Sequence, residues 1–178
     1  MMKIFSCAAA LSAAISASVG LVPMASAAPA KFQKLQPIFK SYQAELDCLA
    51  RAVYFEARSE SLAGQHAVAR VILNRVDSEY YPHKICEVVY QNQHMRNACQ
   101  FSFACDGTDL TIREPAAFET ALQVARSNFH CDSDCRSWKG DVARSTHYHA
   151  DYVNPFWAAK LESTGKVGRH LFYYTATR

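Results

Sequence analysis

One carboxylate lies on the apolar side of a predicted helix. Residues 41–58 carry apolar side chains at three- and four-residue spacing, which is typical of a helix with one buried side. At about 100° per residue, Leu49, Val53 and Glu56 fall within about 60° of one another on the helical wheel. Burial favours the neutral form of a carboxyl group and therefore raises its pKa. A glutamic acid in such a place can stay protonated near neutral pH and act as a general acid.

The same pattern also fits a structural role. Glu56 could form an ion pair with Arg70 or Arg75, which lie on the next predicted helix, and periodicity alone leaves both interpretations open. Glu60 would fall on the same side if the first helix continued that far. The serines on either side of Glu60 favour a helix end instead, so the pattern alone favours a solvated or capping carboxylate there.

The second candidate constellation is His147-x-His149. On an extended strand both rings would point to the same side, and Asp151 would continue that side. His170 falls on the next predicted strand, so these residues could hold a zinc ion. The chain has no H-E-x-x-H helix, however, and two histidines lining a polar cleft are the commoner arrangement. We therefore predict no metal and no other cofactor, and keep a zinc-dependent amidase or peptidase as the alternative.

The N-terminus has the features of a secretory signal peptide. Lys3 is the only charged residue before Lys31, the segment between them is apolar, and Ala25-Ser26-Ala27 is a small-x-small cleavage site. We therefore predict a signal peptide over residues 1–27 and export to the periplasm or cell envelope. An uncleaved anchor is the alternative, because the apolar run is long enough to span a bilayer. After cleavage, no membrane-spanning segment is expected.

Cleavage would leave six cysteines. An even number of cysteines in an exported chain predicts up to three disulfides, whose pairing the sequence leaves open. Only one pair is closely spaced, so a four-ligand zinc site is the weaker interpretation, and a local bridge within that pair is one possibility. A G-x-S-x-G elbow is absent, and this many cysteines in an exported chain argue against a free thiolate nucleophile. The six are Cys48, Cys86, Cys99, Cys105, Cys131 and Cys135.

The overall composition is that of one globular domain. The 178 residues are 50% hydrophobic and 20% charged, so the chain can bury enough apolar surface to offset its ordering entropy. Lysine and arginine total 19 against 16 acidic residues, a formal charge of +3. This small excess argues against a strong electrostatic nucleic-acid binder and would not repel an anionic polymer. We expect a monomer with no nucleic-acid partner.

Hydrophobic periodicity predicts helices first and strands last. Such an order is typical of an α+β fold, here mainly helical with a small antiparallel sheet near the C-terminus. Residues 28–47 are treated as an N-terminal arm, with 28–40 lacking a helical pattern, and residues 48–178 as the catalytic domain. The predicted helices cover residues 41–58, 62–77, 85–90 and 115–128, the strands 146–151 and 169–175, a loop 91–113, and one or two helical turns 156–161.

Several segments resemble the SleB/CwlJ cell-wall hydrolases. The segment C-L-A-R-A-V-Y-F-E-A-R-S-E (48–60), followed by G-Q-H-A-V-A-R-V-I-L-N-R-V (64–76), is similar to the first motifs of that family. The segments C-Q-F-S-F-A-C-D-G (99–107), T-H-Y-H-A-D-Y-V-N-P-F-W (146–157) and G-R-H-L-F-Y (168–173) are similar to its later motifs. The resemblance keeps the order of the motifs over residues 48–173.

The resemblance implies a lysozyme-like catalytic domain that acts on peptidoglycan. Members of the family cleave glycan strands between N-acetylmuramic acid and N-acetylglucosamine as lytic transglycosylases, which leave 1,6-anhydro products. The catalytic acid is the first glutamate of E-A-R-x-E, which is Glu56 here. The motifs place a further set of residues near the cleft, and we expect these to bind substrate: Glu60, Gln100, Phe101, Ser102, His147, Tyr148, His149 and Tyr173.

The chain departs from the family in its cysteines, and we expect it to lack the separate peptidoglycan-binding domain that some members carry. Residues 28–47 are too short for one, which favours general wall turnover over spore-cortex specificity. A lysozyme-type muramidase is a further alternative, and it would need Asp106 or Asp151 across the cleft from Glu56 to activate a water molecule. A non-catalytic wall-binding module is supported only by the density of aromatic residues near the C-terminus.

Overall fold

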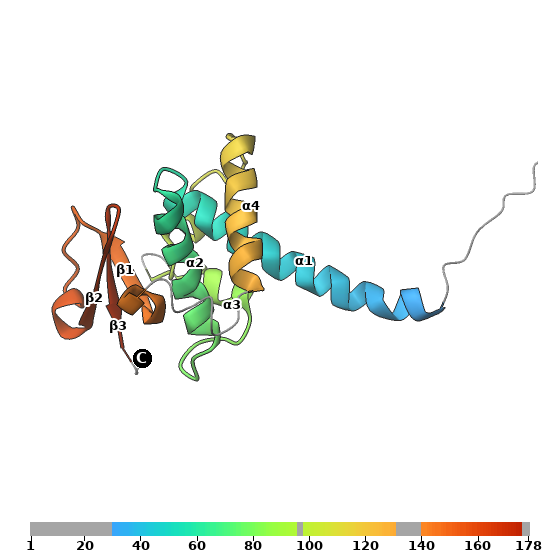
Figure 1. The fold of residues 1–178 in the computed structure, drawn as a ribbon, viewed down its shortest axis with the longest axis horizontal. Helices are drawn as coiled ribbons and strands as arrows, with labels where there is room; N and C mark the ends of the chain where they lie inside the picture. The colour runs from blue at the N-terminus through green and yellow to red at the C-terminus, as the bar shows by residue number, and fades with distance from the viewer. Residues whose placement is uncertain (1–29, 96–97, 131–139, 176–178) are drawn as a thin grey trace, which may run out of the picture.

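The computed structural model describes residues 30–95, 98–130 and 140–175. Four helices form one part of the molecule and a three-stranded sheet forms the other, with the sheet packed against α2 (Figure 1). The helices are α1 (Ala30–Ala57), α2 (Leu62–Val76), α3 (Ile85–Val89) and α4 (Pro115–Phe129). The predicted signal peptide and the cysteines Cys131 and Cys135 lie outside the described residues.

Helix α1 begins earlier than the sequence pattern predicts. Residues 30–40, which we expected to lack helical structure, are helical, and this part of α1 extends away from the other helices (Figure 1). Over residues 36–40 the apolar side chains bury little surface, since Ile38 is 68% exposed and Phe39 is 65% exposed. A helical segment without a buried side has no apolar stripe, and this is why periodicity missed these residues.

The second half of α1 forms the centre of the helical core. It packs against α2, α3 and α4, and the Cys48–Cys86 disulfide joins it covalently to α3. Ser61 caps the start of α2, since its hydroxyl accepts a hydrogen bond from the backbone N–H of Gly64, and Pro115 occupies the first turn of α4. The core includes buried side chains from all four helices, among them Leu49, Val53, Ile72, Val88 and Val124.

The sheet contains one strand more than the sequence predicts. Strand β1 (His147–Ala150) pairs with β3 (His170–Tyr174), and β3 pairs with β2 (Glu162–Val167), in the order β1-β3-β2 and antiparallel throughout. Strand β2 was missed because it is polar and irregular, with a register shift between Ser163 and Gly165. The predicted turns at 156–161 are a 3₁₀ helix over Ala158–Lys160. The predicted α+β class is confirmed.

Helix α2 has two buried sides, and this joins the sheet to the helices. Ile72 faces the helical core, whereas Ala67 and Val71 pack with Phe172 of β3 and with Val142. Val142 belongs to a 3₁₀ helix over Gly140–Arg144, which precedes β1. Among the residues that the structure describes, none of the helices combines the length and hydropathy that a bilayer crossing requires.

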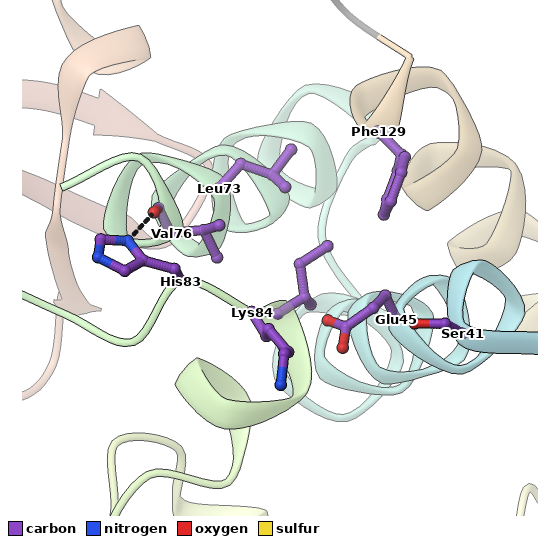
Figure 2. Close-up of a pocket in the computed structure, with 8 residues that line it drawn as sticks. Ser41, Glu45, Leu73, Val76, His83, Lys84 and Phe129 are labelled. Carbon is purple, nitrogen blue, oxygen red and sulfur yellow. Dashed lines mark hydrogen bonds between the residues drawn. The ribbon is translucent and has the colours of Figure 1, made fainter. Parts of the chain in front are cut away.

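A cavity of about 340 Å³ lies where α1, α2 and α4 approach the start of α3. Figure 2 shows Leu73 and Val76 of α2, Phe129 of α4 and Glu45 of α1 around it. The Glu45 carboxylate accepts a hydrogen bond from the backbone N–H of Cys86. Glu45 precedes Glu56 by about 16 Å along the axis of α1, so this cavity is separate from the candidate active site.

Candidate active site

Glu56 lies in the last turn of α1 and points toward the sheet. Its side chain is half-buried, and its Oε2 accepts a hydrogen bond from the Tyr148 hydroxyl at 2.9 Å. Tyr148 is on β1, so the contact joins residues 92 positions apart. The helical wheel therefore identified the side of α1 on which Glu56 lies, and the fold supplies the partner.

The environment of Glu56 favours its protonated form. Burial is the main cause, and it raises the pKa of Glu56 above its ordinary value. The hydrogen bond from Tyr148 acts in the opposite direction because it stabilises the carboxylate. The negative charge of Asp106 raises the pKa further, and the positive charge of Arg75 lowers it. The net upward shift is the property that a general acid requires.

Arg75 holds two walls of the site together rather than closing an ion pair with Glu56. Its buried guanidinium donates through Nε to the carbonyl of Thr146 and through Nη1 to Oε1 of Gln100, each at 2.7 Å. The guanidinium carbon also lies 5.3 Å from the ring centre of Tyr81 and 5.5 Å from that of Phe101. The other arginine suggested by the sequence, Arg70, instead approaches Asn128.

The segment 99–106 forms the wall that Arg75 contacts. A disulfide between Cys99 and Cys105 closes it, and a 3₁₀ helix over Ser102–Ala104 turns its chain. Phe101 is buried in the helical core, whereas Ser102 is exposed. Gln100 therefore has a structural contact, and Ser102 is the residue of the predicted Q-F-S set that is open to solvent.

Two cavities meet at Ser102. One, of about 320 Å³, is lined by Cys99, Gln100, Ser102, Cys105 and Asp106. The other, of about 400 Å³, lies beside the end of α1 and is lined in part by Phe55, Arg58 and Phe103. Glu56 lines neither cavity, but Phe55 precedes it directly and Asp106 is close enough to change its pKa. Asp106 thus connects the first of these cavities to the electrostatic environment of Glu56.

The two predicted histidines lie on the other face of the sheet from Tyr148. Alternation along β1 turns His147 and His149 away from α2. The His149 ring stacks on Tyr173, with centres 5.3 Å apart, and Trp157 lies against both histidines and Tyr173. We call His147, His149, Trp157 and Tyr173 the outer aromatic cluster.

Most of the side chains proposed as zinc ligands make other contacts, although Nδ1 of the buried His170 has no hydrogen-bond partner in the described part of the chain. His149 Nδ1 donates to the carbonyl of Ala150 at 2.9 Å, which leaves Nε2 to accept from the Tyr173 hydroxyl at 3.0 Å. Asp151 binds Lys166 at 2.8 Å, and His170 is buried beside Tyr148 on the inner face. Among the described residues, no group of three or more histidine, cysteine or acidic side chains could hold a metal ion.

Glu60 is placed against the backbone of the sheet. Its Oε2 accepts a hydrogen bond from the N–H of Arg169, in the turn between β2 and β3, at 3.1 Å. Of the predicted substrate-binding residues, the structure thus brings Tyr148 to Glu56, groups His147, His149 and Tyr173 on the outer face, and gives Glu60 a contact with the hairpin. The sequence did not predict that Arg75 connects Gln100 to Thr146. It indicated only a possible ion pair between Arg75 and Glu56.

The chain is similar to cell wall hydrolases and to spore cortex-lytic enzymes. A family profile described as Cell Wall Hydrolase matches residues 59–173. The spore cortex-lytic enzyme of Bacillus subtilis is 26% identical over 128 residues, which is 72% of this chain and 37% of that protein. The spore cortex-lytic enzyme of Oceanobacillus iheyensis is 26% identical over 130 residues, which is 73% of this chain and 41% of that protein. The chain thus spans less than half the length of these relatives.

Two solved structures share the lysozyme-like fold. The catalytic domain of the Bacillus cereus SleB protein superposes with a TM-score of 0.53 and 26% identity, over 74% of this chain and 91% of that domain. The catalytic domain of the germination-specific lytic transglycosylase SleB from Bacillus anthracis gives 0.54 and 27%, over 74% and 95%. Since the family profile matches well over half of the sequence, the chain belongs to the cell wall hydrolase family.

Proposed function

We propose that this protein cleaves the glycan strands of peptidoglycan and that Glu56 is the acid–base catalyst. The observation that carries the proposal is the half-buried Glu56 carboxyl group, whose pKa is raised by burial and which accepts a hydrogen bond from Tyr148. Membership of the cell wall hydrolase family supports the substrate. The similarity to a structure named as a lytic transglycosylase supports the type of reaction. The predicted signal peptide agrees with action in the periplasm or cell envelope.

The reaction proposed is an intramolecular transfer. Protonated Glu56 donates its proton to the glycosidic oxygen between N-acetylmuramic acid and N-acetylglucosamine, and the bond from that oxygen to the muramic anomeric carbon breaks. Positive charge develops at this carbon, as in other glycosidic cleavages. The Glu56 carboxylate then removes the proton of the sugar's own 6-hydroxyl, whose oxygen bonds to the anomeric carbon. The product is a 1,6-anhydro sugar, and Glu56 is protonated again.

The Tyr148 hydroxyl can hydrogen-bond Glu56 in both its protonated and its ionised form. It bonds one oxygen, Oε2, and leaves Oε1 to carry the proton that is transferred. After transfer, the same hydrogen bond stabilises the carboxylate that forms. We propose that the two cavities at Ser102 receive sugar units on one side of Glu56, and that the outer aromatic cluster supplies rings for stacking against sugars at the far edge of the sheet.

A lysozyme-type hydrolysis is the second candidate, and Asp106 is the observation that favours it. Its exposed carboxylate acts on Glu56 and has a lowered pKa, mainly because the Thr108 side chain and N–H donate to it. Asp106 is therefore ionised at neutral pH and could activate a water molecule. Asp151 lacks this relation, because it pairs with Lys166 near the end of the sheet.

Digestion of purified sacculi in heavy-oxygen water separates the two reactions. Attack by the 6-hydroxyl gives fragments that end in 1,6-anhydro-N-acetylmuramic acid and contain no oxygen from the solvent. Attack by water gives fragments with a reducing end that carries the heavy oxygen. We expect the anhydro product, and heavy oxygen at the muramic end would leave the hydrolase as the function.

An Asp106→Asn variant provides a matched control for that experiment. The amide keeps the size of the side chain and removes its charge, so a transglycosylase should retain its product and most of its rate. A hydrolase that depends on Asp106 should lose activity by roughly 10²-fold or more, the usual contribution of a general base. Release of free stem peptides without glycan cleavage would instead support the amidase or peptidase alternative.

A further inference from the structure

The Glu60 carboxylate joins two parts of the molecule that are distant in sequence. Glu60 lies in the turn between α1 and α2, and the Arg169 N–H that it accepts lies 109 residues later, in the turn between β2 and β3. Strands β1 and β2 also contact α2, so the Glu60 contact adds a second link between the sheet and the chain that follows α1.

Two glycines leave the space that the Glu60 side chain occupies. Gly168 has a φ of +57°, and a Cβ at this position would overlap the Glu60 carboxylate. On the other side, a Cβ at Gly64 would lie 2.9 Å from the Cβ of Glu60. The backbone of both neighbouring elements is therefore shaped around this one side chain.

The contact continues from the hairpin to the catalytic acid. Arg169 is followed by His170, whose buried ring lies 5.0 Å from the Tyr148 ring. The carbonyl of Arg169 also accepts a hydrogen bond from the N–H of Asp151 at 2.7 Å, which fixes the end of β1 against the same turn. Tyr148 on β1 then donates to Glu56. Hydrogen bonds and a ring contact thus connect Glu60, through the hairpin and Tyr148, to the Glu56 carboxyl group near the same end of α1.

We propose that Glu60 is a positioning residue, whose bond to the hairpin turn holds Tyr148 within hydrogen-bonding distance of Glu56. The proposal rests on the proposed role of Glu56 as the catalytic acid. It gives the second acid of the E-A-R-x-E motif a function without direct contact with the sugar. The Glu60 carboxylate acts by its reach to the Arg169 N–H rather than by its charge.

The charged and polar groups around Glu56 make this testable. Tyr148, Asp106 and Arg75 face Glu56 from β1, from segment 99–106 and from α2, and Tyr148 is the one of the three that lies on a strand paired with the hairpin. If the Tyr148 bond is weakened, the Glu56 carboxylate loses a donor and its pKa rises. Removing the negative charge of Glu60 would by itself act in the opposite direction, so the sign of the change distinguishes reach from charge.

The experiment is an NMR titration of protein that contains isotope-labelled glutamate, which follows the Glu56 carboxyl group directly. The Glu56 signal is assigned as the one that disappears in Glu56→Gln. We expect the titration midpoint to rise by about one pH unit in Glu60→Ala and in Tyr148→Phe, the size of a hydrogen bond to a charged group. The double variant should show no further rise. Glu60→Gln keeps an oxygen acceptor and should titrate like the wild type, whereas Glu60→Asp keeps the charge, falls short of Arg169 and should behave like Glu60→Ala.

Glu162→Ala is the matched control. Its exposed carboxylate joins β2 to Arg144, at 3.1 Å for Oε2, and does not touch the hairpin turn. It should leave the Glu56 titration unchanged. A Glu60→Asp titration that matches the wild type, or a shift in Glu60→Gln instead, overturns the proposal. A merely stabilising role would lower the melting temperature of Glu60→Ala without moving the midpoint, and this also overturns it.

Activity measurements separate failure of this proposal from failure of the proposed function. If Glu56 is the acid, the alkaline limb of activity on sacculi should move upward in Glu60→Asp by the same amount as the NMR midpoint. A midpoint that moves while Glu56→Gln remains active supports the positioning contact and rejects Glu56 as the catalyst. A midpoint that stays in place while Glu56→Gln is inactive rejects only the positioning role.

Discussion

The two faces of the small sheet make different contacts, although their residues alternate along the same strand. On the inner face, Tyr148, His170 and Phe172 pack together against α2, and Tyr148 reaches Glu56. On the outer face, the outer aromatic cluster makes ring contacts and has its histidine nitrogens engaged by Tyr173, by backbone and by neighbouring hydroxyls.

The difference shows why residues that are adjacent in a motif need not share a function. In the segment H-Y-H (147–149), Tyr148 turns toward the helices and the two histidines turn to the other face, because successive side chains in a strand alternate. The inner face therefore contacts Glu56 directly through Tyr148, whereas the outer aromatic cluster makes no direct contact with Glu56. Substitutions on the two faces should accordingly differ in both size and kind.

Glu56→Gln should have the largest effect. The amide is nearly isosteric and keeps an oxygen to accept from Tyr148, but it cannot donate and recover a proton. We expect lytic activity on sacculi to fall by ~10²–10⁴-fold, the range of general acid–base catalysis. The melting temperature should not fall, since the buried carboxyl group is replaced by a neutral one. A loss of less than roughly tenfold would contradict the assignment.

Tyr148→Phe should have the next largest effect. It removes the hydroxyl and leaves the ring contacts of the inner face, so the fold should persist. We expect activity at the optimum to fall by about tenfold, as for loss of a hydrogen bond to a charged group. Because the lost bond stabilised the carboxylate, the pKa of Glu56 should rise, and the alkaline limb of the pH profile should move upward. An unchanged limb would show that Tyr148 acts only in packing.

Apolar periodicity and alternation predicted the elements with a regular buried pattern, which are the helices and the strands β1 and β3. Helices α2 and α4 agree with the predicted ranges to within one residue, because apolar spacing, Ser61 and Pro115 fix their cores and starts. Residues 36–40 of α1 and the strand β2 were missed for the same reason, since neither has a regular buried side. A partner elsewhere in the chain stabilises β2, and local sequence does not contain that information.

In the candidate site, too, local sequence predicts some features and tertiary contacts determine the others. Glu56 was recognisable because a carboxylate interrupted an apolar stripe, and this signal is local. The contacts of Tyr148 with Glu56, of Arg75 with Gln100 and of Glu60 with Arg169 join separate elements, so they depend on tertiary structure. The disulfides Cys48–Cys86 and Cys99–Cys105 are of this kind too: the sequence predicted oxidised cysteines, and the fold decides which thiols meet.

Substitutions on the outer face should have smaller effects. His149→Ala and Trp157→Ala remove rings from the outer aromatic cluster without touching Tyr148 or Glu56. We expect activity to fall by roughly two- to fivefold through weaker binding to sacculi, as for loss of stacking contacts, with no change in the alkaline limb. Chelators should leave activity intact. Strong inactivation by EDTA that zinc reverses would instead restore the zinc-dependent alternative with His147 and His149.

The smallest expected effect is on stability, and it involves His147. Burial, together with the nearby positive charge of Arg75, lowers the pKa of His147 from 6.5 to about 4. The folded state therefore keeps this ring neutral over a range in which the unfolded chain takes up a proton. Stability that is present above pH 6.5 should be lost progressively as the pH falls toward about 4.

His147→Gln should remove that part of the pH dependence. Urea unfolding at about pH 7 and about pH 5 should show a smaller loss of the free energy of unfolding in the variant than in the wild type. Carboxylates in ion pairs, such as Asp109 with Arg113, contribute equally to both proteins and cancel in the difference. His170 on the inner face also has a lowered pKa through burial, so some dependence should remain in His147→Gln. Equal losses in the two proteins would show that the outer face leaves His147 open to solvent, and the contrast between the faces would then rest on Tyr148 alone.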